Sequence, residues 1–184
     1  MTNFLDISYL AEGNPRQRKC FGILRQAGVM EILAPYGPIL TGTIPIETDI
    51  PSSDLDIVCE VHDPEEFAAT LRKNFGSYDR FSLRGSGGTV VCGFFTGGEE
   101  IEIFGSPVHS VRSNAYRHMI VEHRLLTILG GDFRRQVVEL KLGGLKTEPA
   151  FARLLGLPGD PYEALLELET MTDERLAGFR THVN

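Results

Sequence analysis

The sequence predicts an α+β protein in which strands and helices share the N-terminal part and helices alone make up the C-terminal part. Three observations predict this class. Apolar and acidic residues alternate in Ser53–Val58 and again in Glu100–Ile103, which is the period of a half-buried strand. The pair Gly97-Gly98, between two strand-like runs, is typical of a tight hairpin turn. From Ser113 onward the apolar residues recur at helical spacing instead.

The N-terminal part is expected to hold two helices and four or five strands. The first helix begins after Asn14-Pro15, an N-cap followed by a first-turn proline, and its apolar period continues over residues 15–34. The second begins in the same way at Asp63-Pro64 and ends at Gly76. Strands are expected near residues 38–40, 53–62, 78–84, 89–96 and 99–104.

The C-terminal part is expected to be wholly helical. Helices are predicted to begin near Ser113, at the predicted cap Asp132, and near Thr147, Asp160 and Thr172. We therefore expect two regions, an α/β core over residues 1–108 and a helical region over residues 109–184 that packs on the core.

Composition narrows the class of partner. The chain has 184 residues, a net charge of −7 and a pI near 5.2, so a long nucleic acid is not the expected partner. A small nucleotide held with Mg²⁺ is compatible with an acidic protein, because the metal supplies positive charge. The cysteines Cys20, Cys59 and Cys92 lie in apolar runs and are expected to be buried free thiols. With no long apolar run and no basic leader, we expect a cytoplasmic protein without a membrane segment.

The most informative pattern lies in residues 38–58. An apolar run that contains Leu40 opens into Gly42-Thr43, and a polar loop then leads to Ser53-Asp54-Leu55-Asp56. Because side chains alternate along a strand, Asp54 and Asp56 are expected on the same face, with their Cα atoms roughly 6.5 to 7 Å apart. Two carboxylates about 6 Å apart repel by roughly 3 kcal/mol at an effective dielectric near 20, so we expect a cation between them.

The glycine turn, the spacer and the Asp-apolar-Asp strand together resemble the signature of the DNA polymerase β-type nucleotidyltransferase superfamily. The matching residues are Leu40, Gly42, Asp54, Leu55, Asp56 and Ile57, whereas Thr43 stands where the superfamily usually has Ser or Gly. The stretches TGTIPIETDIPSSDLDI and KTEPAFARLLGLPGDPY also resemble a bacterial domain family of unknown activity near that superfamily. The resemblance implies a nucleotidyltransferase-like mixed sheet with flanking helices, followed by a C-terminal helical bundle.

A third carboxylate is needed, because three strand acids hold the two Mg²⁺ ions of in-line phosphoryl transfer. Ile101-Glu102-Ile103 fits best, but Glu100 lies on the same face and remains an alternative. The resemblance implies that Asp54 and Asp56 bind both ions, while Glu102 binds the catalytic ion and activates the attacking hydroxyl. The other interpretation is that these acids simply lie on the solvated face of a strand.

The phosphates of an NTP also need donors and cations. The backbone N–H groups of Gly42 and Thr43 are expected to contact the phosphates, with Ser53 beside them. Four basic side chains are candidates for the far side of the triphosphate, although each alone is more often a solvated surface charge. Lys146 ranks first because it stands at a loop-to-helix junction, and the others are Lys141, Arg84 and Arg117.

These residues predict a small nucleotidyltransferase. With Mg²⁺, it would move a nucleoside monophosphate from an NTP to a hydroxyl of a small molecule or a protein. Two alternatives belong to other classes: a module that binds a nucleotide without reacting, and an interaction protein with a degenerate site. Glu102 separates enzyme from binder, because an enzyme needs this acid and a binder tolerates Glu102→Gln.

Overall fold

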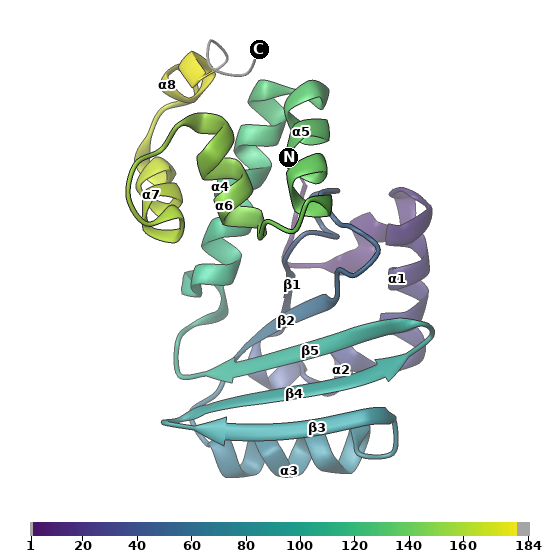
Figure 1. Cartoon of the computed structure of the whole chain (residues 1–184). Coiled ribbons are helices and arrows are strands. Elements are labelled where there is room, and N and C mark those ends of the chain that lie inside the picture. Colours follow the sequence, from purple (N-terminus) through teal and green to yellow (C-terminus); the bar gives the residue numbers. More distant parts are fainter. Residues whose placement is uncertain (1, 180–184) are drawn as a thin grey trace. The chain divides into compact units, whose positions relative to one another are not determined.

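The computed structural model describes residues 2–179 of the chain. It divides into two compact units, whose elements are labelled in Figure 1. The sheet unit comprises Met1–Pro45 and Ser53–Tyr116, and the helical unit comprises Ile46–Ser52 and Arg117–Asn184. The boundary therefore falls inside helix α4 (Asn114–Leu129), and the loop of residues 46–52 belongs with the helices although it connects two strands.

The sheet unit is built on a five-stranded mixed sheet. Its strands are β1 (Ile39–Thr41), β2 (Leu55–Glu60), β3 (Asp79–Ser86), β4 (Thr89–Thr96) and β5 (Glu99–Ser106). Their order across the sheet is β1-β2-β5-β4-β3; β2 and β5 pair in parallel, and the other neighbouring pairs are antiparallel. The predicted α+β class, with a mixed sheet and flanking helices, is confirmed.

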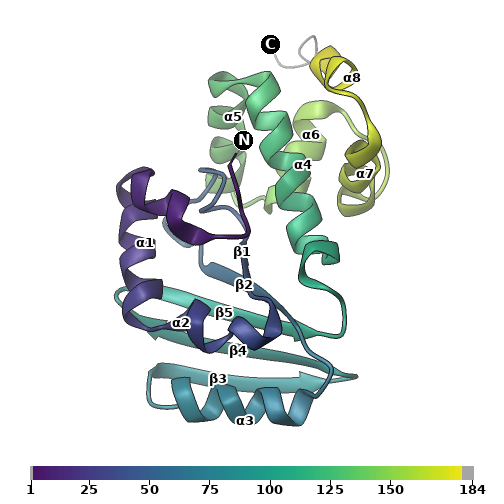
Figure 2. The same ribbon diagram turned by 180° about the vertical axis from the view of Figure 1, so that it is seen from behind.

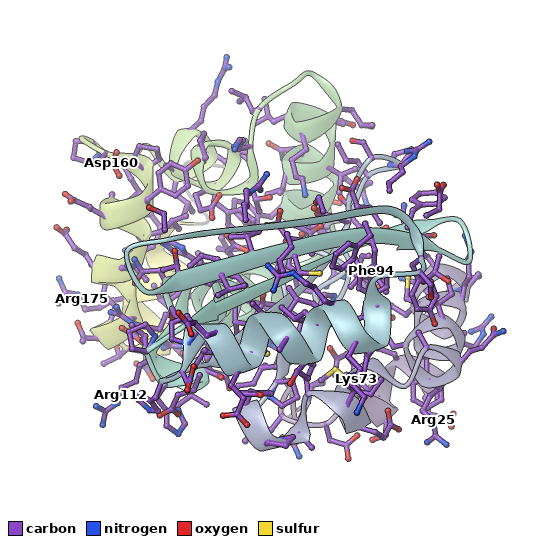
Figure 3. All side chains as sticks on the ribbon, turned by 90° about the horizontal axis from the view of Figure 1, so that it is seen from below. Arg25, Lys73, Phe94, Arg112, Asp160 and Arg175 are labelled. Atoms are coloured by element: carbon purple, nitrogen blue, oxygen red, sulfur yellow. The ribbon has the colours of Figure 1, made fainter. Side chains whose placement is uncertain are left out.

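One face of this sheet forms the core of the sheet unit. Helix α3 (Pro64–Phe75) contacts β3, β4 and β5, and its Phe75 ring stacks on Phe94 of β4 with the ring centroids 4.9 Å apart. Figure 3 shows α3 in front of the strands, with Phe94 labelled. Asp56 and Glu102 alternate along their strands with buried aliphatic residues, so they project from the opposite face. The buried residues with which they alternate are Leu55, Ile57, Ile101 and Ile103.

The prediction of a single helix over residues 15–34 is wrong. The chain forms α1 (Pro15–Gln26), turns at Gly28, and continues as α2 (Val29–Ile32) and a short 3₁₀ helix, Ala34–Tyr36 (Figure 2). Gly28 has a φ of 62°, a left-handed conformation that ends α1 and that glycine adopts without Cβ strain. The predicted start is confirmed, because Asn14 caps α1 and Pro15 is its first residue.

The helical unit contains most of α4 together with four further α-helices in the described residues. These are α5 (Gly131–Leu142), α6 (Thr147–Leu155), α7 (Pro161–Glu167) and α8 (Asp173–Ala177). Asp160 and Thr172 cap α7 and α8 as predicted. Asp132 is not the cap of α5: Gly130 holds that position with a φ of 86°, which favours glycine, and Asp132 lies in the first turn. In the part of the chain that the structure describes, no helix has the length and apolar character of a membrane span.

The cysteines are buried and free, as predicted. Burial raises the pKa of Cys20 to about 11 and the pKa of Cys59 and Cys92 to about 12. Thiols with such pKa values stay protonated near neutral pH and are poor nucleophiles. We therefore assign all three to packing.

Candidate active site

The sheet places Asp56 directly beside Glu102. Strands β2 and β5 are parallel neighbours, and their register pairs Asp56 with Glu102. On its other side Asp56 pairs with Thr41 of β1. Residues that pair across neighbouring strands project to the same face, so the two carboxylates lie together on the face opposite α3, which we call the open face. Glu100, the alternative third acid, is paired with Phe95 of β4 instead.

Gly42 shapes the space next to Asp56. Its φ is 79°, a left-handed conformation that lets the chain turn directly after β1. A Cβ atom at this position would clash with Oδ2 of Asp56. The carboxylate of Asp56 therefore lies against the bare backbone of the turn. Glycine is required here for two reasons, the backbone conformation and the space, whereas the phosphate contact that the sequence suggests stays a prediction.

The loop between β1 and β2 gathers the other predicted residues near this turn. Thr43 lies near the start of the loop and Ser53 near its end. Thr43 Oγ1 donates a hydrogen bond of 3.2 Å to Ser53 Oγ. Asp54 follows Ser53 directly, one residue before β2 and two before Asp56, and both aspartates are half-buried. The glycine turn, the two hydroxyls and the two aspartates thus lie where β1 ends and β2 begins.

A basic side chain of α1 that the sequence reasoning missed holds one end of this loop. Arg16 donates from Nη2 to the carbonyl oxygen of Ser53 at 2.8 Å and to Glu99 Oε2 at 2.9 Å. Lys19 donates to the other carboxylate oxygen of Glu99 at 2.8 Å. Glu99 is buried at the start of β5. Arg16 therefore ties the segment that carries the aspartates to the strand that carries the third acid.

A second side chain of α1 holds the other end of the loop. Gln17 is 4% exposed, and its Nε2 donates to the carbonyl oxygens of Ile44 at 2.9 Å and Pro45 at 3.3 Å. Its Oε1 accepts from the backbone N–H of Asn14, so the same amide closes a capping box on α1. The capping pattern is visible in the sequence as Asn followed by Gln three residues later. The bonds to the loop are not, because no local pattern predicts a contact across 27 residues.

Of the four basic candidates, Arg84 has a described contact with one of the predicted site acids, Glu102. Its Nη2 lies 3.5 Å from Glu102 Oε2, with the Arg84 side chain 74% exposed and that of Glu102 40% exposed. The two residues come from different strands, β3 and β5, with β4 between them. An exposed ion pair of this length contributes little free energy, so it is easily exchanged for another partner.

The other three basic candidates belong to the helical unit. Lys141 is buried and donates to the carbonyl oxygen of Thr48 at 2.7 Å, which anchors the loop of residues 46–52. Arg117 binds the carboxylate of Glu169 through Nε and Nη2. Lys146, which ranks first from the sequence, is exposed and directly precedes α6. The structure therefore gives Lys141 and Arg117 internal roles and leaves the role of Lys146 a prediction.

A separate group of titratable side chains lies inside the helical unit. Glu122 of α4 is 3% exposed, and its Oε1 has no hydrogen-bond partner within residues 2–179. Burial raises the pKa of Glu122 to about 8; the nearby Glu148 raises it further, while Lys141 opposes the shift. Glu122 is therefore mostly protonated at neutral pH. His118 completes the group, with Nδ1 3.7 Å from Glu148 Oε1 and Nε2 2.9 Å from the carbonyl oxygen of Tyr162.

An open hollow of about 550 Å³ lies between α3 and the β3–β4 hairpin. Its walls include Ala68 and Arg72 of α3 and Leu83 and Val90 of the two strands. The three predicted acids do not line it. We therefore do not assign this hollow to the site.

The acids fit a magnesium site in donor type and in placement. Mg²⁺ prefers oxygen ligands and is usually held by one or two carboxylates together with substrate phosphates and water. Asp56 and Glu102 lie side by side and supply two such carboxylates, with Asp54 two residues from Asp56. Across residues 2–179, no three His, Cys, Asp or Glu side chains are already arranged as a metal-binding group. Phosphate oxygens would therefore be needed to complete the ligand set.

Solved structures that resemble this one include nucleotidyltransferases. Cid1, described with RNA terminal uridylyl transferase activity, has a TM-score of 0.53 and 10% identity over 86% of this chain and 50% of that chain. A cytoplasmic RNA terminal U-transferase has a TM-score of 0.51 and 12% identity over 86% and 50%. The structure of mtPAP in complex with UTP has a TM-score of 0.52 and 12% identity over 92% and 42%. The fold of this protein is therefore nucleotidyltransferase-like.

The family of the chain is established by its sequence. The chain belongs to the family described as Domain of unknown function (DUF4269), whose model matches residues 22–168. This range includes the glycine turn and all three predicted acids. No curated protein matches the sequence. The chain spans half or less of the length of the three nucleotidyltransferase structures that resemble it.

Proposed function

We propose that this protein is a Mg²⁺-dependent nucleotidyltransferase of the DNA polymerase β type. It would transfer a nucleoside monophosphate from an NTP to a hydroxyl of a small molecule or a protein. One observation carries the proposal: the parallel register sets Asp56 beside Glu102, and the Asp56 carboxylate lies against the Gly42 turn. The nucleotidyltransferase-like fold supports it.

The roles follow from where the residues lie. Asp54, Asp56 and Glu102 would hold Mg²⁺, which supplies positive charge against the phosphates and orients the reacting groups. Glu102 would also accept the proton of the acceptor hydroxyl as its oxygen attacks the α-phosphorus. One O–P bond then forms to the acceptor, and the bond to pyrophosphate breaks, so pyrophosphate leaves with the electron pair.

The triphosphate would lie beyond the end of β1 and the start of β2. The backbone N–H groups of Gly42 and Thr43 would contact its β- and γ-phosphates, with Ser53 beside them. The hydrogen bond between Thr43 and Ser53 supports this arrangement, because it keeps both hydroxyls next to the turn.

The test is a thermal-shift series with each of the four NTPs, with and without Mg²⁺. Ligand at about 100 times its dissociation constant stabilises the folded protein by roughly 2.7 kcal/mol. We expect at least one NTP to stabilise the wild type only when Mg²⁺ is present, and the Asp56→Asn variant to lose this effect. Glu100→Gln is the matched control, because Glu100 lies on the same face but is paired with Phe95 rather than Asp56.

The opposite result is equally specific. If no NTP stabilises the wild type with Mg²⁺, and Asp56→Asn is more stable than the wild type, the carboxylates repel each other without serving a metal. The proposal is then wrong. Where binding is seen, transfer from an NTP labelled at its α-phosphate measures whether the bound nucleotide reacts.

A second candidate is a module that binds a nucleotide without transferring it. The contact of Arg84 with Glu102 favours this alternative, because a protein cation already accompanies the third acid. Glu102→Gln separates the two. A transferase loses its labelled product when Glu102 is replaced, whereas a binding module makes no product and keeps its nucleotide affinity in the variant.

A further inference from the structure

Strand β5, which carries Glu102, is followed across the sheet by β4 and then β3 (Figure 1). Glu102 pairs with Gly93 of β4, and Gly93 pairs with Ser82 of β3. These pairs project to the same face, so Gly93 and Ser82 lie on the open face in line with Glu102. Gly93 contributes no side chain, and a Cβ there would lie 3.1 Å from Ser82 Oγ. Gly93 and Ser82, which follow Glu102 across the sheet, therefore add no bulky side chain to this surface.

The next row of the same face is apolar and ends in a cation. Phe104 of β5 pairs with Val91 of β4, and Val91 pairs with Arg84 of β3. Phe104 is 38% exposed and Val91 is half-buried, so this row presents apolar surface to the solvent. A flat apolar body could therefore rest on Phe104 and Val91 while its two ends meet Glu102 and Arg84.

Metal binding would change the partner of Arg84. With Mg²⁺ on Glu102, the attraction of this carboxylate for the guanidinium weakens, because the metal supplies the charge that Arg84 supplies in its absence. The exposed 3.5 Å pair is weak and opposes this exchange little. Arg84 is then a cation beside the reacting centre that is available to an anionic group.

Arg80, the other arginine of β3, offers a contrast. It lies at the irregularity between Asp79 and Ser82 with a φ of 54°. Its guanidinium lies over the Phe95 ring at 4.9 Å, and its Nε is 3.8 Å from Asp79 Oδ2. Arg80 therefore has a carboxylate partner that is not a site acid, and Mg²⁺ at Glu102 would leave this pair intact.

We propose that Arg84, Val91 and Phe104 form the acceptor subsite, and that the acceptor is a small hydroxyl compound that carries a negatively charged group. This inference rests on the proposed function. The hydroxyl would lie at Glu102, the body over Phe104 and Val91, and the anionic group at Arg84. The hydroxyl oxygen forms the new bond to the α-phosphorus, its proton passes to Glu102, and pyrophosphate leaves with the electron pair.

The test measures binding of two aromatic hydroxyl compounds of similar size and opposite charge. The probes are 3-(4-hydroxyphenyl)propionate, an anion, and tyramine, a cation. Each is titrated calorimetrically into the protein loaded with Mg²⁺ and the α,β-methylene analogue of the NTP that stabilises it. We expect the anion to bind at least about tenfold more tightly, and Arg84→Gln to remove this preference. Arg80→Gln is the charge-matched control and should retain it.

All other outcomes of this experiment contradict the proposed acceptor subsite. Equal binding of the two probes, or no binding of the anion, overturns it while the proposed function stands. If Arg84→Gln instead weakens the binding of the nucleotide analogue, Arg84 serves the triphosphate and the assignment is wrong. If no nucleotide stabilises the wild type with Mg²⁺, the proposed function fails, and the subsite that rests on it fails with it.

Discussion

Carboxylates in two regions of this molecule have opposite environments. In the sheet unit, Asp56 and Glu102 lie side by side on a strand face and remain partly exposed, where a cation from solution can reach them. In the helical unit, Glu122 is buried, and its pKa is raised to about 8. Strand pairing aligns two acids side by side, whereas helix α4 turns a single acid inward. The same chemical group is suited to metal binding in one region and is held neutral in the other.

The strongest test of the carboxylates in the sheet unit is a substitution that fills the space beside Asp56. Gly42→Ala adds a Cβ that clashes with Asp56 Oδ2 and imposes a positive φ on a residue that disfavours it. Because the carboxylate must move, we expect nucleotidyl transfer to fall by about 10²-fold or more. Stabilisation by Mg²⁺ and NTP should fall in parallel in a thermal-shift assay.

Gly88→Ala is the matched control for this substitution. Gly88 has a φ of 85°, close to that of Gly42, but a Cβ there would meet nothing within 4 Å. Both variants therefore carry the backbone strain of about 1–2 kcal/mol, and Gly42→Ala alone disturbs the acid. Equal losses of transfer in the two variants would show that the contact of Gly42 with Asp56 has no functional role.

The buried carboxyl group is tested by replacing Glu122 with a side chain that does not titrate. Its pKa is raised in the folded protein, so the folded state keeps a proton that the unfolded state releases. The stability from this group is full below about pH 4.5 and is lost as the pH rises to about 8. Glu122→Gln should remove this loss, and its stability relative to the wild type should grow by a few kcal/mol between pH 5 and pH 8. Urea unfolding at several pH values measures the difference.

Glu148 gives this prediction a second test. Its charge raises the pKa of Glu122 beyond the effect of burial alone. Glu148→Gln should therefore narrow the pH range over which the wild type loses stability, without abolishing the loss. A stability difference between Glu122→Gln and the wild type that does not change with pH would contradict the assignment of a raised pKa.

The two regions also differ in how much of their structure can be predicted from the sequence. Alternation predicts the strand that carries Asp56, because the period of a strand is local, but it starts that strand too early: β2 begins at Leu55, and Asp54 lies one residue before it. The pairing of Asp56 with Glu102 depends on which strands become neighbours, and the bond of Arg16 to Glu99 spans 83 residues, so neither follows from a local pattern. A sequence pattern for Glu122 does exist: it stands three residues from both Met119 and Leu125, within the apolar stripe of α4.

Glu99 is an intermediate case, a buried carboxylate that has cationic partners. Its side chain is 9% exposed and is paired with Arg16 at 2.9 Å and Lys19 at 2.8 Å. Glu99→Gln leaves Arg16 without its charged partner, and we expect a loss of about 1–3 kcal/mol in the free energy of unfolding. The neighbouring Glu100 is exposed, so Glu100→Gln should change the same quantity by less than about 0.5 kcal/mol. Equal urea midpoints for the two variants would contradict a structural role for Glu99.

The smallest expected effect belongs to exposed carboxylates at helix starts. Asp160 accepts hydrogen bonds from the backbone N–H groups of Tyr162 at 2.9 Å and Glu163 at 3.1 Å, so Asp160→Ala should cost about 1 kcal/mol. Asp132 lies in the first turn of α5 and binds Arg135 on the surface, so Asp132→Ala should cost no more than a few tenths of a kcal/mol. Thermal midpoints of the two variants measure this difference. A larger loss for Asp132 than for Asp160 would contradict this order and would show that a carboxylate stabilises a helix start without bonding to its backbone.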